Sequence, residues 1–66
     1  MCDEKESVRI DYIVCRLRKG RPRPTGWKRT NAPACRTRYS RWMVYHNGRW
    51  IELHRSPTGT NYIVVK

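Results

Sequence analysis

Hydrophobic and polar residues alternate along three segments of this chain, and alternation with a period of two is typical of β-strands. The first segment, residues 8–17, carries apolar side chains on both faces of the expected strand: Val8, Ile10, Tyr12 and Val14 on one, and Ile13, Cys15 and Leu17 on the other. Two partly apolar faces indicate a strand near the middle of a sheet, or one that curls so that its two ends contribute different faces to the core. A helix is the competing interpretation, but the β-branched and aromatic residues favour the strand.

The second segment predicts a β-hairpin. Residues 41–46 and 49–54 flank the dipeptide Asn47-Gly48, which suits a two-residue type I′ turn because both turn positions need positive φ. This turn fixes the register, so that Val44 faces Ile51 on one side and Tyr45 faces Trp50 on the other. The side that carries Val44 is expected to belong to the core, and the other to be only partly covered.

The third segment, residues 62–65, is a short apolar strand that follows a turn at residues 56–61. Consecutive strands are usually neighbours, so the last three strands are expected to form an antiparallel meander. Adding residues 8–17 and a short piece around residues 37–39 gives four or five strands. We therefore predict an all-β fold, either a small twisted antiparallel sheet or an SH3-like half-open barrel, since closure limits exposed edges.

The 66 residues leave room for one domain, because a chain this short hides only about 60% of the surface that its unfolded form exposes. Residues 1–7 are polar and acidic and are expected to be a flexible tail, with residues 8–66 as a single small β domain. Residues 20–34 hold three prolines and two glycines and hardly an apolar side chain. Proline supplies no donor to a sheet and biases its predecessor toward extended angles, so this stretch is predicted to be a basic loop with polyproline character.

The net charge of +10 is concentrated in one part of the chain. All ten unbalanced bases lie between Arg16 and Arg41, a window without Asp or Glu, and the flanks are neutral. Eleven of the fifteen basic residues are arginine, whose planar fork matches phosphate in a bidentate manner, whereas lysine would suffice for solubility. Segregated charge of this size creates a potential of several kT, so it indicates a polyanionic partner.

Part of this window, Lys19-Gly20-Arg21-Pro22-Arg23, resembles the AT-hook, a short DNA-binding motif whose centre is Arg-Gly-Arg-Pro. The resemblance implies an extended core in the minor groove of A·T-rich duplex, with Arg21 and Arg23 reaching toward the base edges. Lys19 stands where the family has its first core arginine, and Pro24 where it usually has a base. The competing interpretation is a solvated proline-rich turn whose bases aid solubility.

The predicted nucleic-acid-binding residues are those of this motif with the neighbouring bases and one tryptophan: Arg18, Lys19, Gly20, Arg21, Pro22, Arg23, Trp27, Lys28, Arg29, Arg36, Arg38 and Arg41. The last three are expected to alternate along one face of a strand as a second strip of charge, unless they merely form a solvated outer sheet face. Tyr45 and Trp50 are a candidate platform for stacking with unpaired bases. The interpretation that we favour for this pair is packing in the core.

Cysteine and histidine patterns support neither a metal site nor a catalytic one. Cys2, Cys15 and Cys35 are odd in number and have no Cys-x-x-Cys spacing, so we expect reduced thiols, with a Cys15–Cys35 disulfide as the alternative. Neither His46 nor His54 has an obvious carboxylate or nucleophile as a partner, and no glycine-rich phosphate loop is present, so we expect no enzyme, no metal and no other cofactor. No apolar run is long enough for a membrane span.

The sequence therefore predicts a non-enzymatic nucleic-acid-binding protein, with DNA favoured over RNA. The motifs of common RNA-binding modules are missing, so an RNA-binding or ribosome-associated protein stays a further alternative that no motif supports. The alternative is a small basic protein-binding module or inhibitor, for example a phage-encoded one, that acts on an acidic protein or a nucleoprotein complex. Either would be expected in the cytoplasm, and a DNA-binding protein at the nucleoid or nucleus. The oligomeric state is not predicted.

Overall fold

The computed structural model describes residues 8–26 and 28–65. This part of the chain forms seven β-strands: β1 (Val8–Arg18), β2 (Arg21–Pro24), β3 (Thr30–Arg36), β4 (Trp42–His46), β5 (Arg49–Glu52), β6 (His54–Arg55) and β7 (Asn61–Val65). Within those residues, no helix is long and apolar enough to cross a membrane. The tail predicted for residues 1–7 lies outside the described residues.

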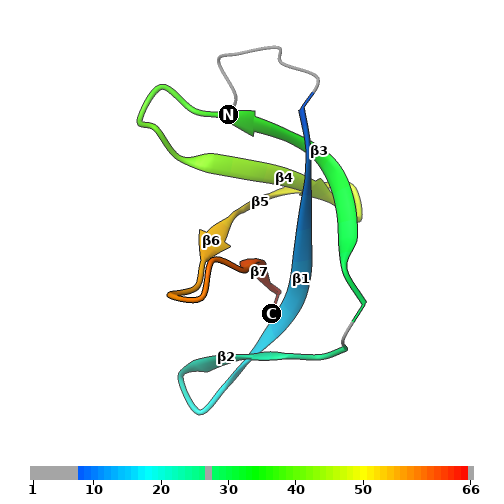
Figure 1. Cartoon of the computed structure of the whole chain (residues 1–66), viewed down its shortest axis with the longest axis vertical. Coiled ribbons are helices and arrows are strands. Elements are labelled where there is room, and N and C mark those ends of the chain that lie inside the picture. Colours follow the sequence, from blue (N-terminus) through cyan, green and yellow to red (C-terminus); the bar gives the residue numbers. More distant parts are fainter. Residues whose placement is uncertain (1–7, 27, 66) are drawn as a thin grey trace.

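The strands form one mixed sheet that curls into a half-barrel (Figure 1). Their order is β5-β4-β3-β1-β7-β6, and β2 pairs with β1 outside this path. The two ends of the path, β5 and β6, are consecutive in the chain and separated only by Leu53. A sheet whose opposite edges are joined by one residue has to curl, and this connection explains the half-barrel.

The predicted all-β half-barrel is confirmed, but the predicted strand number and the purely antiparallel sheet are wrong. There are seven strands rather than four or five, and β1 and β7 run parallel, with Val14 opposite Ile63 and Cys15 opposite Val64. The second strand of the Asn47-Gly48 hairpin breaks at Leu53, so that β5 pairs with β4 while β6 turns away to pair with β7. This break adds one strand and brings β7 onto β1 in the same direction.

One strand, β2, and the first five residues of another, β3, lie in the stretch that was predicted to be a loop, residues 20–34. In β2, Pro22 faces Leu17 and Pro24 faces Cys15. The Thr25 amide donates to the Val14 carbonyl over 3.1 Å, and bonded and non-bonded pairs alternate along an antiparallel ladder. Both prolines therefore stand at non-bonded positions, where a missing N–H removes no hydrogen bond.

The second of these strands, β3, has few apolar side chains to mark it. Its core-facing residues are the small Ala32 and Ala34, which are buried, and it pairs with β1 on one side and β4 on the other. Alanine has low β-propensity and gives little hydrophobic signal. The strand forms because its neighbours supply the packing that its own sequence lacks.

The core fills the inside of the half-barrel. Its buried members are Tyr12, Ala32, Ala34, Val44 and Ile63, and six partly buried residues pack against them: Ile10, Val14, Trp42, Ile51, Leu53 and Val65. Ile10, Tyr12 and Val14 of β1 thus face the core, which confirms the prediction that these residues lie together on one face of the strand. The register predicted for the Asn47-Gly48 hairpin is also confirmed, with Val44 opposite Ile51 and Tyr45 opposite Trp50.

The cysteines behave differently from one another. Cys15 is a free, buried thiol, and burial raises its pKa above the usual value. Cys35 is disulfide-bonded, so the expectation of a reduced thiol is confirmed for Cys15 and wrong for Cys35. Because Cys15 is free, the alternative Cys15–Cys35 bond does not form.

Candidate nucleic-acid interface

The most basic element of the structure is the β1–β2 hairpin. Its two turn residues, Lys19 and Gly20, have φ values of 50° and 76°, close to the 47° and 79° of Asn47 and Gly48 in the other hairpin. These angles belong to a type I′ turn, whose twist matches that of the flanking strands. The hook-like residues therefore form a tight paired hairpin, which projects beyond the half-barrel at one end of the long axis (Figure 1).

Four arginines lie on a single face of this hairpin. In the strand register Arg16 is opposite Arg23 and Arg18 is opposite Arg21. Directly opposite residues share a face, and residues two apart on a strand share it too. Arg16, Arg18, Arg21 and Arg23 thus form one exposed surface, which we call the arginine face.

Nothing in the described part of the chain neutralises the arginine face. None of its four guanidinium groups has a hydrogen-bond or ion-pair partner among the described residues. Arg9, by contrast, donates to the Asn31 side chain over 3.0 Å. Like charges that are directly opposite destabilise a sheet, so the arginine face is unfavourable for folding.

Open clefts run between these side chains. One, of about 490 Å³, is lined by Arg16, Arg18, Arg23, Pro24 and Thr25. A second, of about 330 Å³, is lined by Arg18, Lys19 and Arg23. Both are lined only by the hairpin and the residue that follows it, so the half-barrel does not cover the arginine face.

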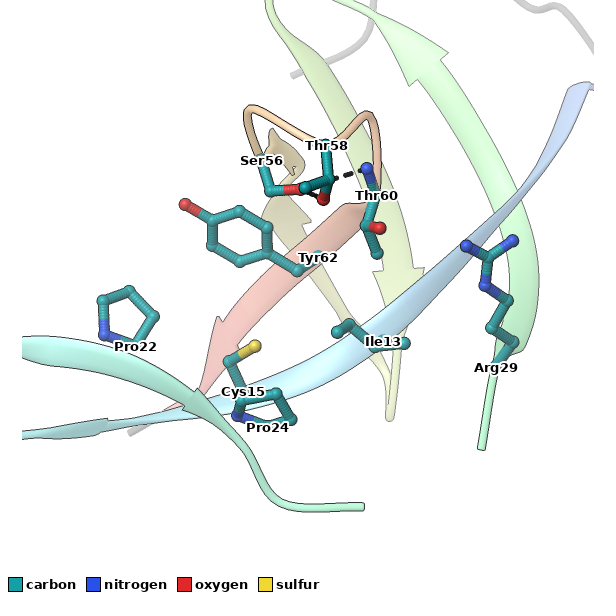
Figure 2. Close-up of a pocket in the computed structure, with 9 residues that line it drawn as sticks. All are labelled: Ile13, Cys15, Pro22, Pro24, Arg29, Ser56, Thr58, Thr60 and Tyr62. Atoms are coloured by element: carbon teal, nitrogen blue, oxygen red, sulfur yellow. Dashed lines mark hydrogen bonds between the residues drawn. The ribbon is translucent and has the colours of Figure 1, made fainter. Parts of the chain in front are cut away.

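The opposite face of the hairpin is apolar and is backed by the half-barrel. Cys15, Pro22 and Pro24 from this face line a pocket of about 480 Å³, together with residues of other elements: Ile13, Arg29, Ser56, Thr58, Thr60 and Tyr62. Figure 2 shows the two prolines on one side of this pocket and the turn at residues 56–60 on the other, with the Tyr62 ring between them. Leu17, on the same face nearer the tip, is 52% exposed. The hairpin therefore has two different faces: the arginine face is charged, and the opposite face is apolar.

The remaining predicted arginines lie elsewhere. Arg36 ends β3, whereas Arg38 and Arg41 belong to the turn before β4, so the predicted alternation along one strand is wrong. This turn is closed by a bond from the Thr37 amide to the Arg41 carbonyl. It lies at the opposite end of the long axis from the β1–β2 turn (Figure 1). A charge window that is continuous in the sequence is thus divided between two ends of the molecule.

The other predicted bases and Trp27 add little to the arginine face. Lys28 is exposed between β2 and β3, and Arg29 lines the apolar pocket rather than the arginine face. Trp27 lies outside the described residues. Arg16, which was not among the predicted binding residues, belongs to the face. The signal that would have found it is the Lys19-Gly20 turn, since a two-residue turn there places Arg16 opposite Arg23.

Tyr45 and Trp50 form an edge-to-face pair on the β4–β5 hairpin, with ring centroids 5.3 Å apart and an interplanar angle of 63°. Their side chains are 44% and 45% exposed, so the prediction that they pack in the core is wrong. Both stand on the outer face of the hairpin, because Val44 and Ile51 take the inner one. The pair is a separate aromatic surface, on a different hairpin from the arginine face.

The two histidines have aromatic neighbours. The Tyr12 hydroxyl and His46 Nδ1 are 2.7 Å apart, and burial raises the pKa of Tyr12 above its usual value. The His54 ring stacks on Tyr62, with centroids 5.3 Å apart. Over residues 8–26 and 28–65, no group of three or more His, Cys, Asp or Glu side chains gathers in a way that would hold a metal ion.

Comparisons of the chain with protein-family models, with curated proteins and with solved structures find no match. A function is therefore inferred from the residues of this chain alone.

Proposed function

We propose that this protein is a non-enzymatic nucleic-acid-binding protein, with DNA as the favoured partner, and that it contacts phosphates through the arginine face. The half-barrel, which we propose to be of the SH3-like kind, is the scaffold that holds the hairpin. The observation that carries the proposal is the cross-strand pairing of arginine with arginine. Arg16 is opposite Arg23 and Arg18 is opposite Arg21, and all four side chains are exposed. Such pairs weaken the fold, and an anionic partner is what turns them into favourable contacts.

The expected strength of this binding depends strongly on salt. Each phosphate neutralised on duplex DNA contributes about −0.9 to the slope of log K against log salt, so four arginine contacts give a slope of about −3.6. Arginine suits the task because its fork binds a phosphate with two parallel hydrogen bonds. Lys19 at the tip of the hairpin would bring the slope to about −4.5.

The experiment is a fluorescence-anisotropy titration of a labelled 16-base-pair duplex between about 50 and 200 mM salt, the range over which phosphate contacts change affinity most clearly. The variant Arg16→Gln/Arg23→Gln removes one cross-strand pair and is expected to reduce the slope by about 1.8. Its matched control is Arg49→Gln/Arg55→Gln, which removes the same charge from β5 and β6. A flat salt response of the unmodified protein, or an equal loss in both double variants, would contradict the proposal.

The arginines of the β3–β4 turn are a second candidate contact with phosphate. They lie at the other end of the molecule, so their contribution is separable by mutation. The variant Arg36→Gln/Arg41→Gln is expected to weaken binding to a long duplex while leaving the hairpin intact. A DNA partner would place the protein at the nucleoid or in the nucleus.

An acidic protein is the second candidate partner, and the exposed Tyr45–Trp50 pair is the observation that favours it. Tyrosine, tryptophan and arginine dominate protein-binding hot spots. Trp50 lines a cleft of about 520 Å³ together with Arg49 and other residues of β4, β5 and β7. A partner that remains bound after nuclease treatment of a lysate, and is lost with Trp50→Ala but not with Arg16→Gln/Arg23→Gln, would support this function instead.

A further inference from the structure

We infer that the pocket on the apolar face of the β1–β2 hairpin binds an unpaired base of the DNA whose phosphates lie on the arginine face. The inference rests on the proposed nucleic-acid-binding function and adds to it a second contact site and the kind of DNA that is preferred. The cavity has a volume of about 480 Å³, within the range of about 300–1,000 Å³ that is typical of small-ligand sites. We call it the base pocket, and its lining residues are Ile13, Cys15, Pro22, Pro24, Arg29, Ser56, Thr58, Thr60 and Tyr62.

Tyr62 supplies a flat apolar surface in the base pocket. The His54 ring stacks on the Tyr62 ring, with centroids 5.3 Å apart and an interplanar angle of 25°. His54 is not among the residues that line the pocket, so it supports the Tyr62 ring from another side. An aromatic ring held in this way is a platform for a base, because every base has a π-face that can stack on it.

The polar groups of the base pocket match those of a nucleotide. Arg29 lies beyond Ile13, at the end of the pocket away from Pro22 (Figure 2). Its guanidinium has no hydrogen-bond or ion-pair partner among the described residues, and an arginine fork binds a phosphate with two hydrogen bonds. The hydroxyls of Ser56 and Thr58 share one hydrogen bond of 2.8 Å. Since that bond uses one of their two protons, one O–H remains to donate to an acceptor on a base edge.

The base pocket and the arginine face belong to the same edge strand. In β2, Arg21 and Arg23 alternate with Pro22 and Pro24, so the two arginines lie on one face and the two prolines on the other. β7 pairs with β1 on the side away from β2, and β2 pairs with β1 alone. Within the described part of the chain, no strand therefore covers the outer edge of β2. A DNA strand can pass around this edge, with its phosphates on the arginines and one base turned toward the prolines.

The base that enters the pocket has to be unpaired. A base inside a duplex is stacked and paired, and its extrusion costs free energy that a bulged or overhanging base does not need. The phosphate contacts of the arginine face are available to paired and unpaired DNA alike. The protein is therefore expected to prefer a duplex that carries an unpaired nucleotide, by about 5- to 150-fold if one base stacks on Tyr62.

The test compares three DNA duplexes of one sequence by fluorescence anisotropy at low salt. The first is fully paired, the second carries one unpaired adenosine, and the third carries an abasic nucleotide in place of that adenosine. The abasic probe keeps the charge and the flexible bulge but lacks the base. The unpaired adenosine is expected to increase the affinity at least about fivefold over the paired duplex, and the abasic probe to stay within about twofold of the paired duplex, since its phosphate contacts are the same. A fluorescent aminopurine in place of the unpaired adenine is expected to lose emission on binding, because stacking quenches it.

The variant Tyr62→Ile removes the stacking platform and keeps a residue that favours a strand. It is expected to abolish the difference between the adenosine and abasic probes. Its affinity for the paired duplex is expected to stay within about twofold of the unmodified protein, because all contacts of the arginine face remain.

A second variant, Arg29→Gln, tests the anion site without a change in the sheet. It is expected to reduce the preference for the adenosine probe over the abasic probe at least about threefold, because a charge-assisted hydrogen bond is lost. The matched control is Lys28→Gln, which removes the same charge from the neighbouring exposed residue that does not line the pocket. Lys28→Gln is expected to leave that preference unchanged.

Three results would overturn the inference while leaving the proposed function in place. The first is equal binding of the three duplexes, and the second is an unchanged preference for the adenosine probe in a Tyr62→Ile protein that still melts cooperatively. The third is tight binding of free deoxyadenosine monophosphate without a preference for the adenosine probe, since the pocket would then serve a free nucleotide. Failure to bind any of the duplexes at low salt would instead contradict the proposed function itself.

Discussion

The cross-strand pair Arg16–Arg23 allows binding and stability to be changed in opposite directions by one substitution. In Arg23→Glu the carboxylate stands opposite Arg16, in the register where a guanidinium now stands. Cross-strand charge pairs are worth about 0.2–1 kcal/mol, repulsive for like charges and attractive for opposite ones. Replacing repulsion by attraction is therefore expected to stabilise the protein by about 1 kcal/mol, which raises the Tm of a domain of this size by about 4–8 °C.

The same substitution is expected to weaken DNA binding. One phosphate contact is lost, which reduces the salt slope from about −3.6 to about −2.7. A carboxylate also faces the phosphates, so the affinity at low salt is expected to fall by at least about tenfold. Thermal denaturation followed by circular dichroism gives the Tm, and anisotropy at several salt concentrations gives the slope. Arg55→Glu is the matched control, because its cross-strand partner is the neutral Asn61.

A double-mutant cycle makes this prediction specific to the pair. Arg16→Glu and Arg23→Glu are each expected to stabilise the protein, whereas the double variant places two carboxylates opposite one another and is expected to lose that gain. If the effects of Arg16→Glu and Arg23→Glu on the Tm were additive in the double variant, the two side chains would not interact, and the conclusion that they share one face would be refuted. So would a lower Tm with unchanged affinity in Arg23→Glu.

Three further outcomes are expected. Gly20→Ala should destabilise the hairpin by about 1 kcal/mol, because φ at Gly20 is 76° and an L-residue is strained there; Gly26→Ala, whose added Cβ likewise meets no atom within 4 Å, is the control, and melting temperatures compare the two. Tyr12→Phe should lower stability by about 1 kcal/mol through its lost hydrogen bond. Burial raises the pKa of Tyr12 above 10.0, so its contribution is complete below pH 10 and is lost as the pH rises further; unfolding midpoints above pH 10 should therefore fall less steeply in this variant. Trp50→Ala should destabilise by about 0.5–1.5 kcal/mol through loss of the Tyr45 contact, with duplex affinity unchanged by anisotropy.

The elements that could be predicted from the sequence are those that pack on the core. The alternating residues of β1 and the Asn47-Gly48 hairpin carry apolar side chains toward the interior, and both were predicted with the observed strand positions or register. The Lys19-Gly20 hairpin has the same turn geometry, but none of its second strand belongs to the core cluster, and the apolar positions of that strand are the prolines Pro22 and Pro24. Its prolines suggested a loop, because a proline fits a strand only at a position whose amide makes no hydrogen bond to the neighbouring strand. Which positions these are depends on the register, which the sequence does not state.

Features that depend on distant pairing were not predictable from local pattern. The parallel pairing of β1 with β7 joins residues such as Val14 and Ile63, and nothing in either segment specifies its partner or direction. The separation of the arginines into two groups has the same origin, since β3 leads the chain away from the β1–β2 hairpin toward the other end of the molecule (Figure 1). The exposure of Trp50 also follows from the curl of the sheet, which covers only its inner face.

The parallel β1–β7 pair has a consequence for the order in which the protein folds. The β1–β2 and β4–β5 hairpins close loops of only two residues, whereas the paired residues Ile13 and Tyr62 are 49 positions apart in the sequence. Contacts distant in sequence form slowly because the entropy of loop closure is lost before they stabilise the chain. The half-barrel is therefore expected to close last, when β7 docks on a β1 that already carries its hairpin. Changes that weaken the β1–β7 contact should then mainly speed unfolding, and changes near the Lys19-Gly20 turn should alter the stability of the β1–β2 hairpin.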